Sequence, residues 1–156
     1  MGKIYHATLK TNEIMQKESV TLVPGQYVEI GRVVVKADEQ IAMGYGKDDT
    51  QQNAQGRIFA HLLDAEGNEI SGKLRIMMTS SQNIPVGNPP IPLDMDLAAL
   101  SQGENDRIGQ VPFPCTGTML SKDKVFVFLV CNDAAAPQIV SREKSYMLLD
   151  ITKTLV

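Results

Sequence analysis

The stretch KVFVFLVCND, residues 124–133, contains seven consecutive apolar side chains. Successive side chains of a β-strand face opposite sides of the sheet, so this segment is apolar on both sides. One side carries Phe126, Phe128 and Val130, and the other carries Val125, Val127, Leu129 and Cys131. A strand of this kind needs a cover on each side, because exposed apolar surface forgoes its burial free energy. The core of the chain supplies one cover, and the second has to be found.

Strand and turn signals dominate the rest of the chain and predict an all-β fold. Pro24 and Gly25 form a turn pair, and Gly31 interrupts an apolar run and predicts a bulge or a bend. No internal repeat or linker divides the sequence, and we expect residues 1–156 to form a single β-sandwich domain. The strand-like runs lie near residues 4–9, 20–35, 40–45, 57–63, 73–79, 110–120, 125–131 and 146–151.

Two local features stand between these runs. The runs 57–64 and 73–79 flank a polar segment with Gly67 and Asn68 at its turn, which predicts a β-hairpin. The segment after it is rich in proline, which blocks both helices and central strands. Residues 94–102 then predict the only short helix of the chain, with Asp94 as its N-cap and Gly103 as its stop.

Composition excludes several classes of protein. The net charge is −3 and no run of Lys or Arg occurs, so direct contact with nucleic acid is not expected. The longest apolar run is the seven residues quoted above, whereas a membrane-spanning helix needs about 20. Cys115 and Cys131 are predicted to be buried thiols, with a single bridge between them as the alternative. We expect a soluble protein that is made inside the cell.

Residues capable of catalysis or metal binding are few. His61 lies in an apolar run between Phe59 and Leu63, which favours a packed residue over a ligand. The alternative is that His6 and His61 meet near a carboxylate in a cupin-like metal site. Acidic side chains around the proline-rich segment indicate a solvated loop more than a calcium site: Asp94, Asp96, Glu104 and Asp106. The sequence therefore predicts no catalytic residue, no metal and no cofactor.

Strands that are apolar on both sides recur at residues 33–35, 57–63 and 146–151. A long loop, an added layer of a closed barrel or a neighbouring subunit would each cover the second side. Because one proline-rich loop cannot cover several strands, we predict self-association. The candidate interface residues come from two of these strands: Phe126, Phe128, Val130, Phe59, His61 and Leu63.

A single all-β domain with two-sided strands, long loops and no catalytic motif resembles the viral coat proteins of the single jelly-roll type. The resemblance covers the whole chain and rests on the strand runs given above, with NIPVGNPPIPLDMDL and KDDTQQNAQG as long loops. It implies an eight-stranded antiparallel sandwich of two four-stranded sheets, assembled as trimers or larger shells. We expect no basic N-terminal arm of the kind that holds RNA in many such proteins, since only Lys3 and Lys10 occur among the first ten residues.

These patterns favour a structural, self-assembling subunit, as a major, minor or decoration capsid protein of a virus particle. Its partners would be further copies and other virion proteins, in a virion assembled in the host cytoplasm; otherwise the protein would be cytoplasmic. The first alternative is a cupin-like or barrel-like protein that binds a small molecule or a metal, with or without catalysis. The second is a β-rich adaptor in a larger complex.

Overall fold

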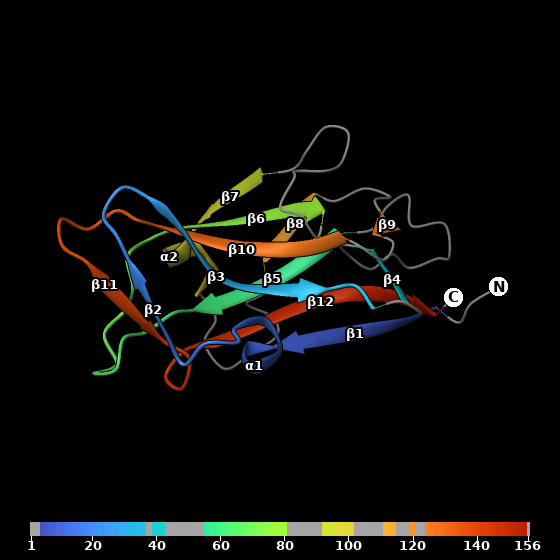
Figure 1. Cartoon of the computed structure of the whole chain (residues 1–156), viewed down its shortest axis with the longest axis horizontal. Helices are drawn as coiled ribbons and strands as arrows, with labels where there is room; N and C mark the ends of the chain where they lie inside the picture. The colour runs from blue at the N-terminus through green and yellow to red at the C-terminus, as the bar shows by residue number, and fades with distance from the viewer. Residues whose placement is uncertain are drawn as a thin grey trace.

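The structure, a computed structural model, describes residues 4–36, 39–42, 55–80, 92–101, 111–114, 119–120 and 124–155 (Figure 1). Strands form two main antiparallel sheets and a small two-stranded sheet at one end. The hydrophobic core contains side chains from both main sheets, including Phe126 and Leu149, so these sheets make a sandwich.

The six-stranded sheet is organised around the last strand, which pairs with β1 on one edge and with β5 and then β4 on the other. Along the sheet the order is β8-β5-β12-β4-β9, with β1 beside β12. Its members are β1 (Ile4–Lys10), β4 (Glu39–Ala42), β5 (Gln55–His61), β8 (Val111–Pro114), β9 (Met119–Leu120) and β12 (Tyr146–Leu155).

The four-stranded sheet places the opening stretch of the sequence between two partners, in the order β3-β10-β6-β7. Its members are β3 (Tyr27–Val34), β10 (Lys124–Asn132), β6 (Gly72–Ser80) and β7 (Pro92–Asp96). The two-stranded sheet pairs β2 (Ser19–Leu22) with β11 (Gln138–Ser141), and the helices are α1 (Thr11–Ile14) and α2 (Leu97–Leu100). The fold class is therefore all-β, as predicted, with one more short helix than the sequence indicated.

Eight of these strands have the connectivity of a jelly roll. One sheet contains β1-β12-β5-β8 and the other contains β3-β10-β6-β7, so the chain crosses repeatedly from one sheet to the other. This order is that of two interlocked Greek keys, and it confirms the predicted jelly-roll sandwich. The crossing also brings the N-terminal and C-terminal strands side by side as β1 and β12 (Figure 1).

The predicted hairpin between residues 57–64 and 73–79 is wrong. β5 belongs to the six-stranded sheet and β6 to the four-stranded sheet, and only a bridge between Leu63 and Glu69 links the two arms. The turn itself is where the sequence placed it, because Gly67 has a φ of 85°. A jelly roll sends the two strands to opposite sheets, and a local turn pattern does not report that choice.

Gly31 lies at a bulge, as predicted, where the register between β10 and β3 shifts after Phe128. A Cβ atom at Gly31 would lie 2.0 Å from the carbonyl oxygen of Ile14, the last residue of α1. Glycine is therefore needed here for close backbone approach. This contact holds α1, which the sequence did not predict, against the four-stranded sheet.

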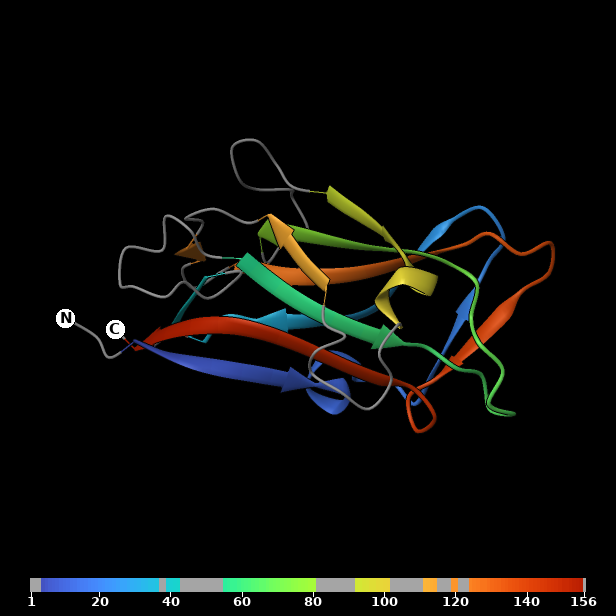
Figure 2. The same ribbon diagram turned by 180° about the vertical axis from the view of Figure 1, so that it is seen from behind.

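The second helix differs in detail from its prediction. Its N-cap is Asp96, and Asp94 lies in strand β7, so the assignment of Asp94 as N-cap is wrong. The proposed stop at Gly103 lies outside the described residues. Pro92 is the first residue of β7, an edge strand, which is the position where proline is tolerated in a sheet. Seen from behind, α2 lies beside β5 (Figure 2). Neither described helix has the length to span a membrane.

Candidate subunit interface

Three of the six predicted interface residues lie inside the sandwich. Phe126, Phe128 and Val130 have no exposed surface in the single chain and belong to its hydrophobic core. They face the six-stranded sheet from β10, and their burial does not depend on a second copy. Whether any of the six residues contacts another subunit stays a prediction.

The opposite side of β10 is also covered within one chain. Val125 and Val127 are buried, with Val127 only 6% exposed, although neither belongs to the hydrophobic cluster that contains Phe126 and Phe128. In the register of the sheet, Val127 lies between Arg32 of β3 and Met77 of β6. Side chains directly opposite on neighbouring strands share one face and contact each other, so these long side chains flank the valine. The burial of Val125 and Val127 therefore needs no second copy, whereas Leu129 and Cys131 on the same side are half-buried.

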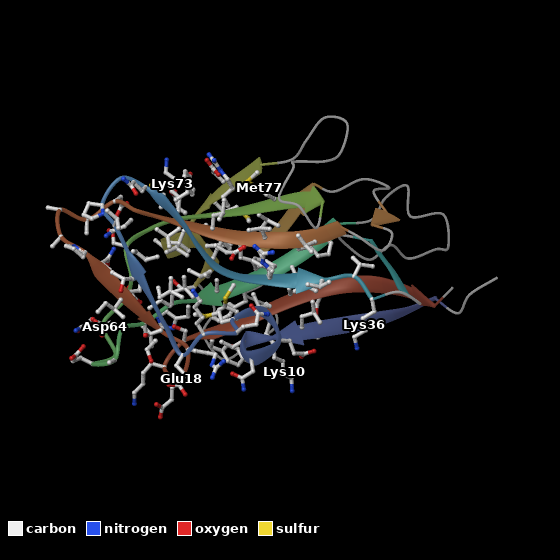
Figure 3. All side chains as sticks on the ribbon, in the orientation of Figure 1. Lys10, Glu18, Lys36, Asp64, Lys73 and Met77 are labelled. Carbon is white, nitrogen blue, oxygen red and sulfur yellow. The ribbon has the colours of Figure 1, made fainter. Side chains whose placement is uncertain are left out.

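A polar clamp lies further along the same face. The guanidinium of Arg75 donates two hydrogen bonds to the carboxylate of Asp94, at 2.6 and 2.9 Å, and stacks 3.8 Å from the centre of the Tyr27 ring. The Tyr27 hydroxyl donates to the same carboxylate at 2.8 Å. The clamp joins β3 to β6 and β7, and it spans Leu129 and Cys131, the β10 residues that pair with Arg75 and Tyr27. Figure 3 shows the neighbouring Lys73 and Met77 along β6.

The clamp also changes the acidity of its members. The hydrogen bonds from Arg75 hold the pKa of Asp94 below its ordinary value. Burial raises the pKa of Tyr27, and its hydrogen bond to Asp94 acts in the same direction. Asp94 was considered as a calcium ligand, but in the structure its two oxygens accept from Arg75 and Tyr27. Both carboxylate oxygens therefore accept hydrogen bonds from residues of the same sheet.

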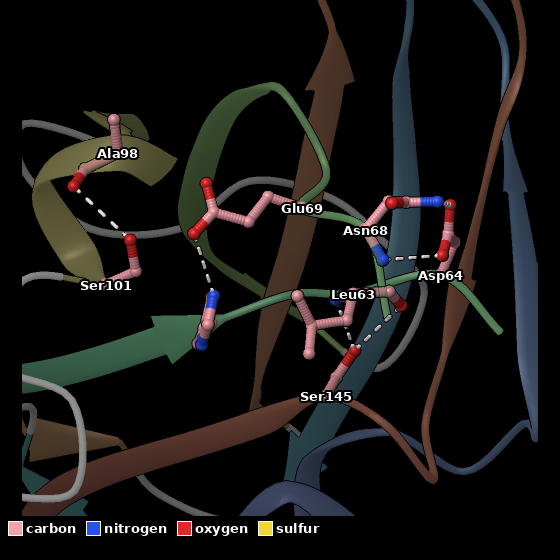
Figure 4. A network of polar contacts seen from close by, with 8 residues as sticks. Leu63, Asp64, Asn68, Glu69, Ala98, Ser101 and Ser145 are labelled. Carbon is pink, nitrogen blue, oxygen red and sulfur yellow. Dashed lines mark hydrogen bonds and ion pairs between the residues drawn. The ribbon is translucent and has the colours of Figure 1, made fainter. Parts of the chain in front are cut away.

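The remaining candidates lie around the end of β5 on the six-stranded sheet. Phe59 is 2% exposed and packs edge-on against Tyr146, with ring centroids 5.8 Å apart. His61 is 3.1 Å from a carboxylate oxygen of Glu69, and the backbone N–H of Leu63 donates to the Ser145 hydroxyl at 2.9 Å (Figure 4). These contacts explain why an aromatic and an imidazole are tolerated on the outer side of the sheet.

Tyr146 is the residue in this group that the sequence analysis did not select. It is 50% exposed, on the face opposite to the core, next to His61 in the strand register. The other large hydrophobic side chains that the described part of the chain exposes are scattered: Val23, Val34 and Ile139. Tyr146 with Phe59, His61 and Leu63 is named the β5 face below.

Two cavities open on the described surface. One, of about 390 Å³, lies between α2 and the turn after β5 and is lined by His61, Glu69, Asp96 and Asp133 among others. The other, of about 700 Å³, lies beside α1 and is lined mainly by hydroxyl and charged side chains, including Arg142 and Glu18. Within the described residues, no three His, Cys, Asp or Glu side chains are grouped so that they could hold a metal. The side chain of His6, as well as Glu104 and Asp106, lies outside the described set.

The fold defines the class of protein, a jelly-roll sandwich, which here carries one polar clamp on the four-stranded sheet and one aromatic pair on the six-stranded sheet. No family model matches the sequence, and no curated protein sequence matches it either. Solved structures do match. The complex of VP16 and VP17, the two major capsid proteins of bacteriophage P23-77, has a chain that superposes with a TM-score of 0.61 at 8% sequence identity. The match covers 99% of this chain and 100% of that one.

VP17 alone, a capsid protein of bacteriophage P23-77, matches with a TM-score of 0.58 at 8% identity. This match covers 99% of the present chain and 98% of VP17. At this level of identity the likeness shows the fold, and it confirms the resemblance to viral coat proteins at the level of fold. The described part of the chain therefore has the fold of a jelly-roll capsid protein.

Proposed function

We propose that the chain is a structural subunit of a virus capsid, located in the virion. The observation that carries this proposal is the match to capsid proteins over 99% of this chain and 98–100% of theirs. The likeness therefore extends over nearly all of the given sequence and nearly all of the capsid-protein chains. A structural, non-catalytic role fits this simple layout.

The partners of such a subunit are further copies of the chain and other virion proteins. The similar structure of VP16 and VP17 is a complex of two capsid proteins, which supports a partner of that kind. We assign the contact to the β5 face instead of the three core residues of β10. Tyr146 is the residue of that face with a large exposed apolar surface, and aromatic residues are enriched at protein interfaces.

The role can be tested on the purified protein and on its native source. We expect particles or defined oligomers in electron micrographs and in light scattering of the concentrated protein, alone or mixed with other proteins of the particle. Mass spectrometry of virus particles from the native source should detect the chain in stoichiometric amounts. A monomer at every concentration that is also missing from purified particles would refute the role.

The β5 face has its own test. Tyr146→Asp should leave the fold intact, because Tyr146 is half-exposed, and should weaken assembly. Val34→Asp is the matched control, since Val34 is 58% exposed but lies on the four-stranded sheet. Equal assembly by the two variants and the parent would remove the β5 face from the proposal.

A further inference from the structure

The edges of the sheets differ in how well they are protected against pairing with another strand. An open edge presents unpaired backbone N–H and C=O groups, and proteins usually block it with proline, charge, a bulge or short length. In the described part of the chain, β7 begins with Pro92, and β8 has four residues of which two are proline. β3 has a bulge and carries the ion pair of Glu29 and Arg32. The remaining edge strands β2, β9 and β11 have at most four residues.

The first strand has such protection only at its last residue, Lys10, whose backbone N–H donates to a carboxylate oxygen of Glu13 in α1 at 3.2 Å. β1 pairs with β12 in an unbroken register of seven residues, and no other described strand pairs with it. Its sequence, IYHATLK, contains no proline and no glycine, and its single Lys or acidic residue is Lys10 at the end. Both Figure 1 and Figure 2 show β1 as the outermost strand along one border of the molecule.

We propose that β1 is a pairing edge for a second copy of this chain, with the two β1 strands antiparallel across a two-fold axis at Ala7. This inference deepens the proposed function, because it names a contact through which copies associate. The two six-stranded sheets then continue into each other, and each copy satisfies the open edge of the other.

With a second copy as the partner, which follows from the proposed function, the charge of the strand selects the direction of pairing. In a parallel pair, Lys10 would lie beside its own copy, and like charges directly opposite destabilise a sheet. In the antiparallel pair centred on Ala7, Lys10 lies opposite Ile4 of the other copy. The two lysines are then about 20 Å apart, at about 3.4 Å per residue. Figure 3 shows Lys10 at this border of the molecule.

A cysteine at the two-fold axis tests the pairing. Residues directly opposite in an antiparallel pair have Cα atoms about 4.5–5.5 Å apart, which is within the range for a disulfide. Ala7→Cys adds one sulfur atom to a side chain that is only partly buried against the core, so the fold should be kept. We expect mild oxidation to produce a covalent dimer joined through residue 7 of both copies, identified by mass spectrometry of the linked peptide. Thr21→Cys, on the exposed side of β2, is the control for random collision.

The outcomes separate this inference from the proposed function. A residue-7 link that forms much faster than the Thr21→Cys link, with a dimer of the parent protein in light scattering, supports β1 pairing. A rate of linking equal to the control, or a parent protein that stays monomeric at tens of micromolar, overturns it. Particles that assemble without the residue-7 link would leave the capsid role standing and refute the pairing. A β1 dimer of a chain that mass spectrometry does not find in purified particles would leave the pairing standing and refute the capsid role.

Discussion

Replacing Phe128 by alanine tests whether both sides of β10 are covered within one chain. Phe128 has no exposed surface and belongs to the core, so truncation removes a full aromatic side chain and leaves a cavity. Such a change costs about 3–5 kcal/mol of the free energy of unfolding. Val127→Ala, on the opposite side of the same strand, removes two methyl-sized groups from a side chain that is 6% exposed. We expect a loss of about 1.5 kcal/mol there, at about 0.8 kcal/mol for each buried group.

Urea unfolding followed by far-ultraviolet circular dichroism is the suitable assay, because the chain has no tryptophan for fluorescence. Both variants should lower the midpoint with an unchanged slope, which is the mark of a change in stability alone. The loss relative to the parent should be the same at two protein concentrations tenfold apart.

A contact with a second copy would give a different result. If Phe128 contacted another subunit, the variant would dissociate, and its loss would change by up to about 1.4 kcal/mol over the tenfold range. A loss below about 1 kcal/mol for Phe128→Ala together with dissociation would therefore refute the placement of this residue in the core. The same result for Val127→Ala would show that a second copy covers the outer side of the strand.

Three further changes test local features of the fold. Gly31→Ala should lower the free energy of unfolding by about 3 kcal/mol, because its Cβ atom would collide with a carbonyl of α1. Gly25→Ala should lower it by about 1 kcal/mol, because Gly25 has a φ of 74° but open space around it. Urea unfolding measures both losses. Asn132→Ala should lose about 2–4 kcal/mol in the same assay, since its buried amide makes four hydrogen bonds, and a loss under 1 kcal/mol would contradict that network. Asp94→Asn should destabilise the protein at neutral pH, because Arg75 lowers the pKa of Asp94 in the folded state and the ionised carboxylate thereby stabilises the fold. This stabilisation is fully present above the ordinary pKa of an aspartate, near 4, and is lost as the pH falls through the lowered value. The difference between Asp94→Asn and the parent should then shrink in unfolding measured near pH 3, and a constant difference would exclude the ionised carboxylate as its source.

Much of the fold could be predicted from short-range patterns. The two-sided apolar run of residues 124–133 predicts a strand that is buried on both sides, and residues 125–128 of β10 are all buried. Gly31 marked the bulge, and Gly67 marked the turn after β5. These features depend on the chemistry of one segment at a time, namely side-chain alternation and backbone freedom.

The errors concern contacts between segments. The hairpin prediction failed because a turn signal says where a chain reverses but not which sheet each arm joins. α1 was missed because its four residues carry no helical periodicity, and its place depends on the approach to Gly31. Asp94 looked like a helix cap because it precedes α2, yet its partners Arg75 and Tyr27 are distant in sequence.

The cover of β10 shows the same limit for the candidate interface. The alternation of polar and apolar residues along β6 was present in the sequence and indicates one polar face on that strand. The sequence does not say that β3 and β6 flank β10, and without that knowledge the long side chains of Arg32, Met77 and Arg75 cannot be assigned as its cover. Because Val125 and Val127 are buried within one chain, these two residues are no evidence for a second subunit.

This cover changes where assembly contacts should be sought. A central strand can be apolar on both sides in a two-layer sandwich when its neighbours place long side chains across the outer face, because the aliphatic and aromatic parts of Arg, Met and Tyr bury the apolar surface while their polar ends stay hydrated. A two-sided strand is then no sign of an oligomer by itself. Side chains of neighbouring strands cannot cover the backbone at a sheet edge in this way. A side chain that lies across the face leaves the N–H and C=O groups of the edge unpaired. For this chain, the edge of β1 is consequently a stronger indication of self-association than the apolar sequence of β10.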